Sequence, residues 1–322
     1  PLHPSGLGVI RVSGSRAVPF VGYLFKSGKE KLEKTESHKL VHGWIHDNEI
    51  PIDEVLVIVM RSPRSYTTED VVEIQCHGSP FIMRRILDLL LDQGARLAES
   101  GEFTQRAFLH GRIDLTQAEA VLDLVHANSE LGSALAVQQL KGKLYIEIEK
   151  VKKQVLATAS LVEASIEFPE EDVEFVQRNE CLRQIRKASA DLEKMLVYSN
   201  EGLRIREGFS VALIGKPNVG KSSLFNRLLG DQRAIVTNVP GTTRDYIEES
   251  KEIKGITFRL TDTAGIRKTK DSVESEGIRK TQNVLSRSDL VLLILDGGAK
   301  LNEEDLELIH DIEKKKTIIV IN

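Results

Sequence analysis

The segment Gly215–Ser222 constrains the fold of this chain more than any other. It reads GKPNVGKS and matches the pattern GxxxxGK[ST]. An apolar run, Phe209–Ile214, precedes it and a helical pattern over Ser223–Leu229 follows, so a buried strand turns into a helix here. Backbone N–H groups of such a loop surround phosphate oxygens, and the positive end of the helix adds to that attraction. Because all eight positions and both flanks agree, the sequence predicts a phosphate-binding loop and not a plain glycine turn.

Two side chains of this loop have predicted roles toward a nucleotide. Lys221 would reach the β- and γ-phosphates, and the hydroxyl of Ser222 would bind Mg²⁺. Downstream, residues 257–265 predict a strand that ends in the motif DTAG, in which Asp262 would hold Mg²⁺ through water. The backbone N–H of Gly265 would sense the γ-phosphate, and glycine would let that loop move on hydrolysis.

Two further segments complete the pattern of a GTPase. Residues 236–245 read VTNVPGTTRD, an irregular stretch with hydroxyls suited to a switch loop. Asn322 stands where the guanine-reading motif NKxD would start. A lone DTAG or GTT would carry little weight, but here the phosphate loop, GTT, DTAG and Asn322 follow in the order and spacing of a GTPase domain.

Composition fits a globular chain of several domains. A length of 322 residues favours two or three domains, and 41% hydrophobic with 29% charged residues excludes a disordered or fibrous chain. The net charge of −4 argues against non-specific nucleic-acid binding, which depends on neutralising many phosphates. Cys76 and Cys181 are far apart and form no CxxC, which indicates reduced thiols and a cytoplasmic protein. No apolar run reaches the length of a membrane span.

The periodicity of apolar residues predicts a multidomain α/β chain. Residues 1–112 predict an N-terminal α+β domain, residues 113–205 a helical domain, and residues 206–322 an incomplete P-loop α/β domain. The expected strands of the first domain cover 7–13, 39–46, 52–60 and 70–76, and its expected helices cover 17–25 and 80–91. The second and third of these strands are separated by residues 47–49 at hairpin distance. In the third domain, buried parallel strands are expected over 290–295 and 317–321.

Three observations support the helical domain. Thr116 and Glu119 form a capping-box pattern ahead of an apolar run. Pro169 interrupts the helical pattern because proline removes a donor and blocks a helix, so we expect antiparallel helices joined near it. Apolar residues recur at helical spacing on two expected packing faces: Leu144, Ile148, Val151, Val155, and Leu182, Ile185, Leu192, Leu196.

The residue after DTAG bears on the mechanism. In Ras-like switches a glutamine there orients the attacking water, but here it is Ile266, which cannot do so. Glu274, in the polar segment that follows, could position water, and Glu276 is the competing candidate. Taken alone, the sequence also allows that both are simply surface acids.

The chain resembles the MnmE (TrmE) family of tRNA-modification GTPases, related to Era, over essentially its full length. Four motifs are specific to that family: GVIRVSG, SYTTEDVVEIQCHGSP, GEFTQRAFLHGRIDLTQAEAV and EASIEFPEED. Three are shared more widely among GTPases: GKPNVGKSSLFN, IVTNVPGTTRD and DTAGIR. The resemblance implies a tetrahydrofolate-binding-like N-terminal domain that forms a homodimer, a helical domain, and a G domain inserted into it.

The resemblance also implies site residues. Family folate contacts match Arg11, Glu73 and Arg112, a set that suits a ligand with carboxylates and a pterin ring. From the residues alone, Arg11 and Glu73 would be interpreted as polar ends of strands and not as a binding site. Glu274 matches the family's water-orienting glutamate, and Lys221 is the other expected catalytic residue.

In the G domain, metal and nucleotide contacts follow by the same resemblance. Ser222 and Thr243 match the Mg²⁺ ligands, and Arg244 and Asp245 match switch residues with a conformational role. The family's K⁺ site matches Asn218, Thr237, the carbonyl of Val239, and Thr242. The expected GTP contacts are Asn218, Val219, Gly220, Lys221, Ser222, Ser223, Thr237, Asn238, Val239, Pro240, Gly241, Thr242, Thr243, Asp262, Thr263, Ala264, Gly265 and Asn322.

These implications combine into one expected function. The chain would be a K⁺-stimulated, Mg²⁺-dependent GTP hydrolase that acts with an FAD-dependent flavoprotein, MnmG (GidA). Together they would modify C5 of the wobble uridine, position 34, of certain tRNAs, with a 5,10-methylene- or 5-formyl-tetrahydrofolate as cofactor. The family's later helices, its CIGK motif and the rest of NKxD are absent, so we expect a fragment of a longer protein. A ribosome-assembly switch GTPase and a folate-binding scaffold with vestigial hydrolysis are the alternatives.

Overall fold

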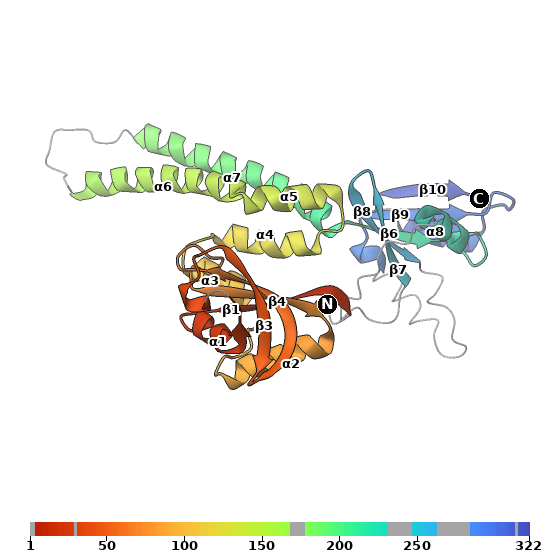
Figure 1. The fold of residues 1–322 in the computed structure, drawn as a ribbon. Coiled ribbons are helices and arrows are strands. Elements are labelled where there is room, and N and C mark those ends of the chain that lie inside the picture. The colour runs from red at the N-terminus through yellow and green to blue at the C-terminus, as the bar shows by residue number, and fades with distance from the viewer. Residues whose placement is uncertain (1–3, 29–30, 168–177, 231–246, 263–283, 313–314) are drawn as a thin grey trace. The chain divides into compact units, whose positions relative to one another are not determined.

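The computed structural model describes residues 4–28, 31–167, 178–230, 247–262, 284–312 and 315–322. Contacts between Cα atoms separate the chain into two compact units, residues 1–121 and residues 122–322 (Figure 1). The division falls within helix α4, Leu115–His126, so the long helices that follow belong to the second unit. Within the described residues, no helix is both long and apolar enough to cross a membrane.

The first unit is built on a five-stranded antiparallel sheet with strand order β1-β5-β4-β3-β2. The strands over residues 39–47 and 50–60 form a hairpin that turns at Asn48, whose φ of 55° is a left-handed conformation that asparagine tolerates. The expected strands and this hairpin are confirmed. The strands are β1 (Ser5–Ser13), β2 (Phe25–Lys26), β3 (Lys39–Asp47), β4 (Ile50–Met60) and β5 (Val71–Gly78).

Two helices, α1 (Ala17–Leu24) and α2 (Pro80–Asp92), cover one face of this sheet, as the sequence predicts. The side chain of Ser79 caps α2 by accepting from the backbone N–H of Ile82, and Pro80 occupies the first turn, where its missing N–H costs nothing. Alternate residues of each strand join the helices in one apolar core. Its fully buried members include Val21, Ile45, Val57, Ile74 and Ile86.

The intervening strand residues lie on the opposite face of the sheet. Arg11 lies between Ile10 and Val12, which contribute to the core, so period-two alternation puts Arg11 on the other face. The same rule puts Glu73, between Val72 and Ile74, on that face beside it. The two residues are direct cross-strand partners in the β1–β5 ladder.

Helix α3 (Glu102–Leu109) and the start of α4 follow the sheet. The expected capping box at Thr116 and Glu119 is wrong. The helix already begins at Leu115, and the box is made two residues earlier: Asp114 Oδ1 accepts from the Gln117 N–H at 2.9 Å, while Gln117 Oε1 accepts from the Asp114 N–H at 3.0 Å. Aspartate with glutamine caps a helix start in the same reciprocal way as threonine with glutamate.

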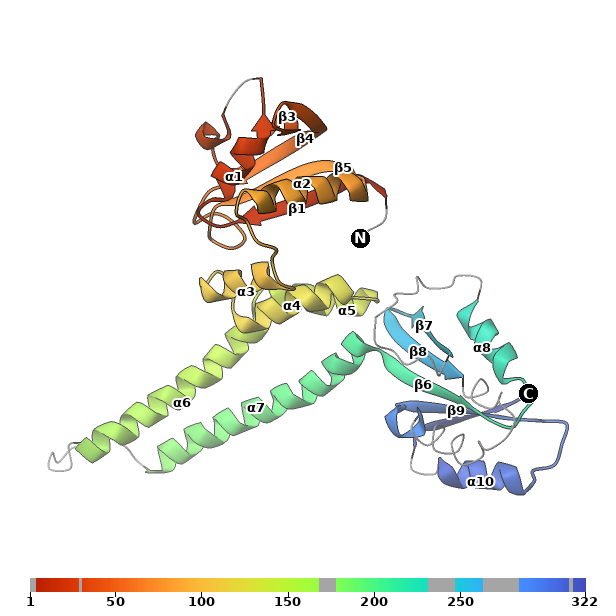
Figure 2. The same ribbon diagram turned by 90° about the horizontal axis from the view of Figure 1, so that it is seen from below.

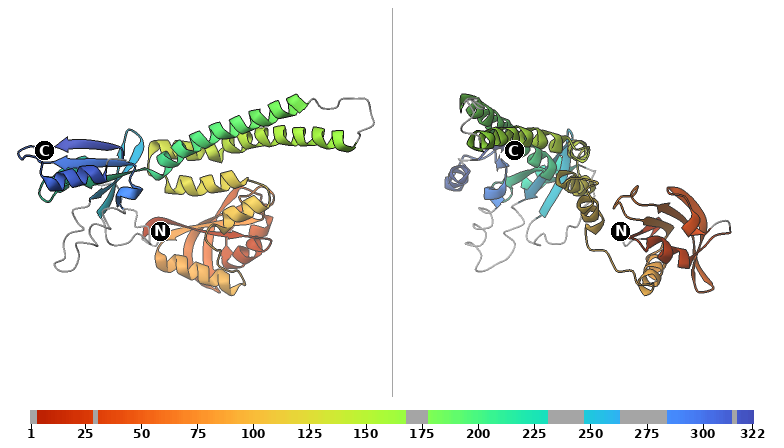
Figure 3. Two further views of the ribbon diagram at one scale, coloured as in Figure 1. Left: turned by 180° about the vertical axis from the view of Figure 1, so that it is seen from behind. Right: turned by 90° about the vertical axis from the view of Figure 1, so that its left-hand side faces the viewer.

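The second unit begins with helices α5 (Glu130–Leu140), α6 (Lys143–Glu167) and α7 (Arg178–Glu207). As expected, α6 and α7 run antiparallel side by side (Figure 1; left view of Figure 3). Ala188 on α7 is buried, and Thr158 Oγ1 of α6 donates to Gln184 Oε1 of α7 at 2.7 Å.

The expected packing faces of these helices are largely wrong. Val151 is buried, but the other seven apolar residues named from their spacing are exposed. Helical spacing shows that residues share a face, but it does not show whether anything covers that face. The exposed members are Leu144 38%, Ile148 39%, Val155 49%, Leu182 39%, Ile185 54%, Leu192 47% and Leu196 64%.

A second five-stranded sheet follows, with strand order β10-β9-β6-β8-β7. All neighbours are parallel except β7, which is antiparallel to β8. Helices α8 (Lys221–Leu229) and α10 (Glu303–Asp311) pack on opposite faces (Figure 2). The strands are β6 (Phe209–Ile214), β7 (Ile247–Ile253), β8 (Ile256–Asp262), β9 (Leu290–Leu295) and β10 (Thr317–Ile321).

The expected buried parallel strands are confirmed for β9 but only in part for β10. Strand β10 pairs in parallel with β9, yet Ile318, Ile319 and Ile321 are exposed because β10 is the edge strand of the sheet. Its apolar character alone could not distinguish an edge from a central position.

The turn between β7 and β8 contacts the start of α5. Leu131 donates its backbone N–H to the carbonyl of Gly255 at 3.1 Å, and Thr257 Oγ1 donates to the carbonyl of Asn128 at 3.2 Å. Thr257 is buried, and a Cβ at Gly255 would lie 3.3 Å from the Leu131 side chain. The nucleotide-binding sheet is therefore hydrogen-bonded to the helical segment at this end.

Candidate functional site

The phosphate-binding loop joins the carboxyl end of β6 to the first residue of α8. Its conformation requires glycine at two positions. Gly215 has φ 154°, and a Cβ there would collide with the carbonyl oxygen of Ile294. Gly220 has φ 97°, and a Cβ there would collide with the side-chain amide of Asn322. The glycines of the motif therefore admit a backbone path that brings N–H groups to the start of α8, where anions bind.

Lys221 folds back over the loop from the first position of α8. Its ammonium donates to the carbonyl of Gly215 at 2.8 Å and to that of Lys216 at 2.6 Å, and the residue is only 6% exposed. Carbonyls are neutral acceptors that the ammonium can exchange for phosphate oxygens. Ser222 and Ser223 are exposed in the first turn beside it. This donor set fits a nucleotide phosphate with its Mg²⁺, as the motif predicts.

The other lysine of the loop has a structural partner. Lys216 Nζ donates to Asp305 Oδ2 at 2.7 Å and to Asn302 Oδ1 at 2.9 Å, and both acceptors belong to the N-terminal capping box of α10. The hydrogen bond from Lys216 lowers the pKa of Asp305. This ion pair fastens α10 to the phosphate-binding loop.

Asn322 reaches the same loop from the end of β10. Its side-chain amide donates to the carbonyl of Val219 at 3.0 Å, and its backbone N–H donates to the carbonyl of Leu295 at 2.9 Å. Asp262 ends β8 in register with Leu213 of β6. The carboxyl ends of four parallel strands therefore meet here, which is where open α/β sheets bind ligands.

Several expected site residues lie outside the described residues. They are Thr237, Asn238, Val239, Pro240, Gly241, Thr242, Thr243, Arg244, Asp245, Thr263, Ala264, Gly265, Ile266, Glu274 and Glu276. The structure brings together Asn218, Val219, Gly220, Lys221, Ser222, Ser223 and Asn322 at the end of the sheet. Of the expected K⁺ ligands, only Asn218 is described; it is exposed and has φ 65°.

In the first unit, the three expected folate contacts have two different surroundings. Arg11 Nε donates to Glu73 Oε1 at 2.6 Å, so these side chains neutralise each other. Arg112 instead lies with its guanidinium carbon 4.8 Å from the centre of the Tyr66 ring. Within the described residues, no carboxylate is in ion-pairing distance of Arg112.

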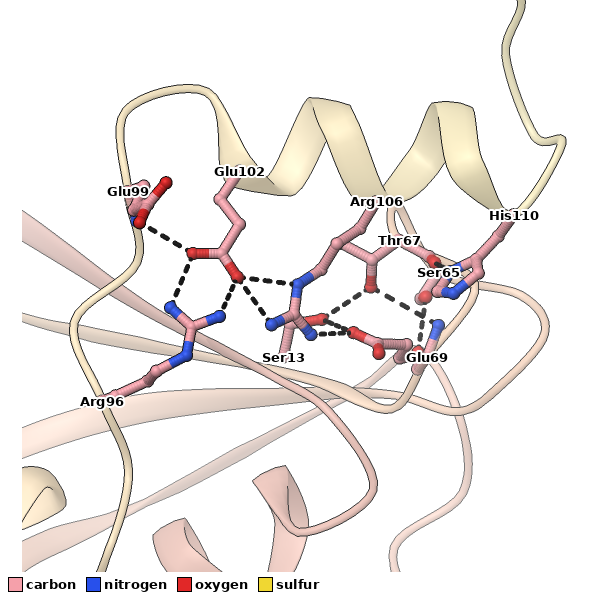
Figure 4. A network of polar contacts seen from close by, with 9 residues as sticks. All are labelled: Ser13, Ser65, Thr67, Glu69, Arg96, Glu99, Glu102, Arg106 and His110. Atoms are coloured by element: carbon pink, nitrogen blue, oxygen red, sulfur yellow. Dashed lines mark hydrogen bonds and ion pairs between the residues drawn. The ribbon is translucent and has the colours of Figure 1, made fainter.

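A polar network ties the segment after β4 to helix α3 (Figure 4). Arg106 donates to Glu69 at 2.8 Å and to Glu102 at 2.6 Å, and Arg96 donates to Glu102 at 2.5 Å. His110 Nδ1 lies 2.6 Å from the carbonyl of Thr67. The loop that carries Tyr66 is thereby fixed against α3 and its C-terminal end through Thr67 and Glu69, which follow Tyr66 in the chain.

The network holds its carboxylates in the charged form. Hydrogen bonds from Arg96, the Glu99 backbone and Arg106 lower the pKa of Glu102 to about 2. Burial by itself raises the pKa of Glu69, but hydrogen bonds from Arg106 and other neighbours outweigh it, and the pKa is lowered. The sequence does not predict this network. The segment SYTTED belongs to a motif of the family, but no local pattern links it to residues 96–110.

Known protein families match both the N-terminal and the C-terminal part of the chain. The family model "GTP-binding protein TrmE N-terminus" matches residues 1–112, and "50S ribosome-binding GTPase" matches residues 210–322. The tRNA modification GTPase MnmE of Alkaliphilus oremlandii is 47% identical over 99% of this chain and 70% of its own length. The chain belongs to the MnmE family.

Other members of the MnmE family match over the same extent. The tRNA modification GTPase MnmE of Enterococcus faecalis is 43% identical over 100% of this chain and 70% of its own length. Among solved structures, Aquifex aeolicus Era bound to GDP.AlF4⁻ is 33% identical over 35% of this chain and 40% of that chain, with a TM-score of 0.28. The family models and the MnmE relatives confirm, at the level of the family, the resemblance seen in the sequence motifs.

Proposed function

We propose that this chain carries the GTP-hydrolysing and folate-binding parts of a K⁺-stimulated tRNA modification GTPase. The observation that supports GTP hydrolysis most directly is the phosphate-binding loop: Lys221 is buried over it, and Asn322 contacts it from β10. The MnmE relatives match across both units, which supports assigning the loop to the same reaction.

In this proposal the residues of the chain divide the work at GTP. Backbone N–H groups at the start of α8 hold the phosphates, and Lys221 exchanges its carbonyl acceptors for phosphate oxygens. Ser222 and Thr243 bind Mg²⁺, and Asn218, Thr237, Val239 and Thr242 bind K⁺. The two cations supply positive charge against the phosphates. Glu274 orients the attacking water, since Ile266 has no hydrogen-bonding group.

The remaining parts of the proposal concern partners. The chain forms a homodimer, hydrolyses GTP as two G domains pair, and acts with the flavoprotein MnmG on the wobble uridine of tRNA in the cytoplasm. A tetrahydrofolate derivative binds at Arg11, Glu73 and Arg112. The Arg11–Glu73 pair, and Arg112, which has no ion-pair partner among the described residues, supply donors and acceptors that match a pterin and a carboxylate.

The first test is the rate of GTP hydrolysis by the full-length protein in matched KCl and NaCl. We expect much faster hydrolysis in KCl, and we expect Glu274→Ala to abolish it. Glu276→Ala is the matched control, because it removes an acid from the same segment two residues away. Equal rates in the two salts would remove the K⁺ assignment, and an active Glu274→Ala with an inactive Glu276→Ala would reassign the water-orienting role.

A further inference from the structure

A cavity of about 510 Å³ lies in the second unit, at the amino ends of the parallel strands β6, β9 and β10. Its lining residues stand at or just before the starts of these strands and near the end of α7. The phosphate-binding loop follows the carboxyl end of β6, so the cavity and the loop are at opposite ends of the sheet. Strand β9 alone, six residues long, spans about 20 Å between those ends.

Positive charge predominates in the lining of this cavity. It contains four cations, Arg204, Arg287, Lys315 and Lys316, and one carboxylate, Asp289. Three of the cations are exposed and Lys315 is half-buried. The chain as a whole has a net charge of −4, so the cavity is a local concentration of positive charge. Such a concentration attracts anions even on a protein of negative net charge.

The carboxylate of the cavity compensates little of this charge. Asp289 Oδ2 accepts from the backbone N–H of Ser210 at 3.0 Å. Arg204 Nε lies 3.8 Å from Asp289 Oδ1, which is beyond the length of a hydrogen bond. Asp289 therefore serves the backbone at the start of β6 and holds Arg204 only loosely.

The other three cations have no carboxylate in ion-pairing distance within the part of the chain that the structure describes. Lys315 Nζ donates to the carbonyls of Ser286 at 3.0 Å and Ser288 at 3.2 Å. These carbonyls orient the ammonium without neutralising it, as in the lysine of the phosphate-binding loop. Arg287 and Lys316 extend from the two chain segments that this lysine joins, so the three charges belong to one surface.

The exposed groups of the lining fit a nucleic acid better than a protein. The apolar members, Phe209 and Leu290, are half-buried, whereas every exposed member is charged or carries a hydroxyl. Protein interfaces are centred on aromatic and aliphatic side chains and contain few charges at their core. Interfaces with nucleic acids are polar and strongly positive, because guanidinium and ammonium groups bind phosphate oxygens.

We infer that this cavity binds the phosphate backbone of RNA through Arg204, Arg287, Lys315 and Lys316. The inference rests on the proposed function, in which the RNA is tRNA, and it assigns the RNA contact to the second unit. Phosphate contacts carry no sequence information, so the site positions the RNA and does not select its sequence. RNA and GTP can be bound together, because their sites are at opposite ends of the sheet.

The test measures the affinity of the full-length protein for fluorescently labelled tRNA by anisotropy, over a series of NaCl concentrations. We expect the double variant Arg287→Ala, Lys316→Ala to weaken binding about tenfold or more, because two phosphate contacts are lost. The slope of log affinity against log salt should become shallower by about one to two, since each phosphate contact contributes about 0.7 to 0.9. Both side chains are exposed, so the unfolding temperature and the rate of GTP hydrolysis should stay unchanged.

Lys187 and Lys194 provide the matched control. They are exposed on α7, outside the cavity, and stand about two turns apart on one face of the helix. The double variant Lys187→Ala, Lys194→Ala changes the net charge by the same amount and should alter neither the affinity nor the slope. Poly-glutamate serves as a second ligand that represents an acidic protein segment, and it should displace little of the bound tRNA.

Each outcome decides the inference. If the cavity variant binds tRNA as the unaltered protein does, or if it and the control lose affinity equally, the inference is wrong while the proposed function stands. If the cavity variant loses poly-glutamate but keeps tRNA, the cavity binds an acidic protein and not RNA. If the unaltered protein binds no tRNA at any salt concentration, the inference falls, and the comparison of KCl with NaCl still decides the proposed hydrolysis.

Discussion

Lys221 in the phosphate-binding loop is buried and Arg106 in the polar network of the first unit is half-buried, but the two cations have different partners. In the network, Arg106 and Arg96 meet the carboxylates of Glu69 and Glu102. In the loop, Lys221 donates to main-chain carbonyls. A carboxylate neutralises the charge of the cation that it binds, so the pair serves to stabilise the fold. A carbonyl or an aromatic ring orients a cation without neutralising its charge, so that the charge can still attract a ligand.

The sharpest test of this comparison uses the two lysines of the loop. Lys221→Ala should lower the rate of GTP hydrolysis by about 10²- to 10³-fold, because a charge directed at the phosphates is lost. Lys216→Ala should leave GTP affinity unchanged and lower the unfolding temperature, because it leaves Asp305 without its ion-pair partner. Hydrolysis assays and thermal melts of both variants provide the measurement. If both substitutions lowered the unfolding temperature and neither changed the rate of hydrolysis, the difference proposed between the two lysines would be wrong.

The second prediction concerns the network and its pH dependence. The pKa of Glu102, about 2 in the fold, lies below the ordinary value of 4.5. Its charged form therefore stabilises the first unit fully above about pH 4.5, and this contribution is lost as the pH falls toward 2. Glu102→Gln should destabilise the unit at pH 7, and the difference from the unaltered protein should shrink at pH 3.

The chain offers a local probe and a control for this measurement. Trp44, the single tryptophan, lies on β3 of the first unit, so its fluorescence during urea unfolding reports that unit. Glu99→Gln changes a neighbouring acid that joins the network through its backbone N–H. It should shift the midpoint little at either pH; a shift as large as that of Glu102→Gln would point to net charge and not to the network.

The smallest expected effect on stability is that of the exposed ion pair between Arg11 and Glu73. Arg11→Ala should cost about 0.5 kcal/mol of stability or less, because the Arg11 side chain is 60% exposed and solvent screens the pair with Glu73. A double-mutant cycle with Glu73→Ala, followed by Trp44 fluorescence, measures the coupling between them. A coupling above about 1 kcal/mol would show that the pair has a structural role and would complicate its use as a folate site.

The parts of the molecule that the sequence predicted correctly depend on local pattern. GKPNVGKS specified a strand, a loop and a helix in consecutive residues, and the β3–β4 hairpin followed from two apolar runs around Asn48. The cap of α4 was misplaced by two residues because two residue pairs satisfied the same capping pattern.

The parts that could not be predicted depend on contacts between distant residues. Ser13, Thr67 and Glu69 meet through hydrogen bonds that span more than fifty residues, and Arg106 joins them from α3. The exposure of Leu192 and Leu196 on α7 depends on what covers the helix, and helical spacing carries no information about that. Among the site residues, the contact of Arg112 with Tyr66 could not be predicted either, because the two residues are far apart in the sequence.

The hairpin of β7 and β8 connects the segments around GTT and DTAG with the start of helix α5. Strand β7 follows directly on the segment that contains GTT, and β8 leads directly into DTAG, so both strands connect at one end to the sequences expected to respond to the γ-phosphate. At the other end, the Gly255 carbonyl and the Thr257 hydroxyl are bonded to the start of α5. If this hairpin shifted along β6, it would either break those two hydrogen bonds or move α5 with it. Strand β8, seven residues long, connects the two ends.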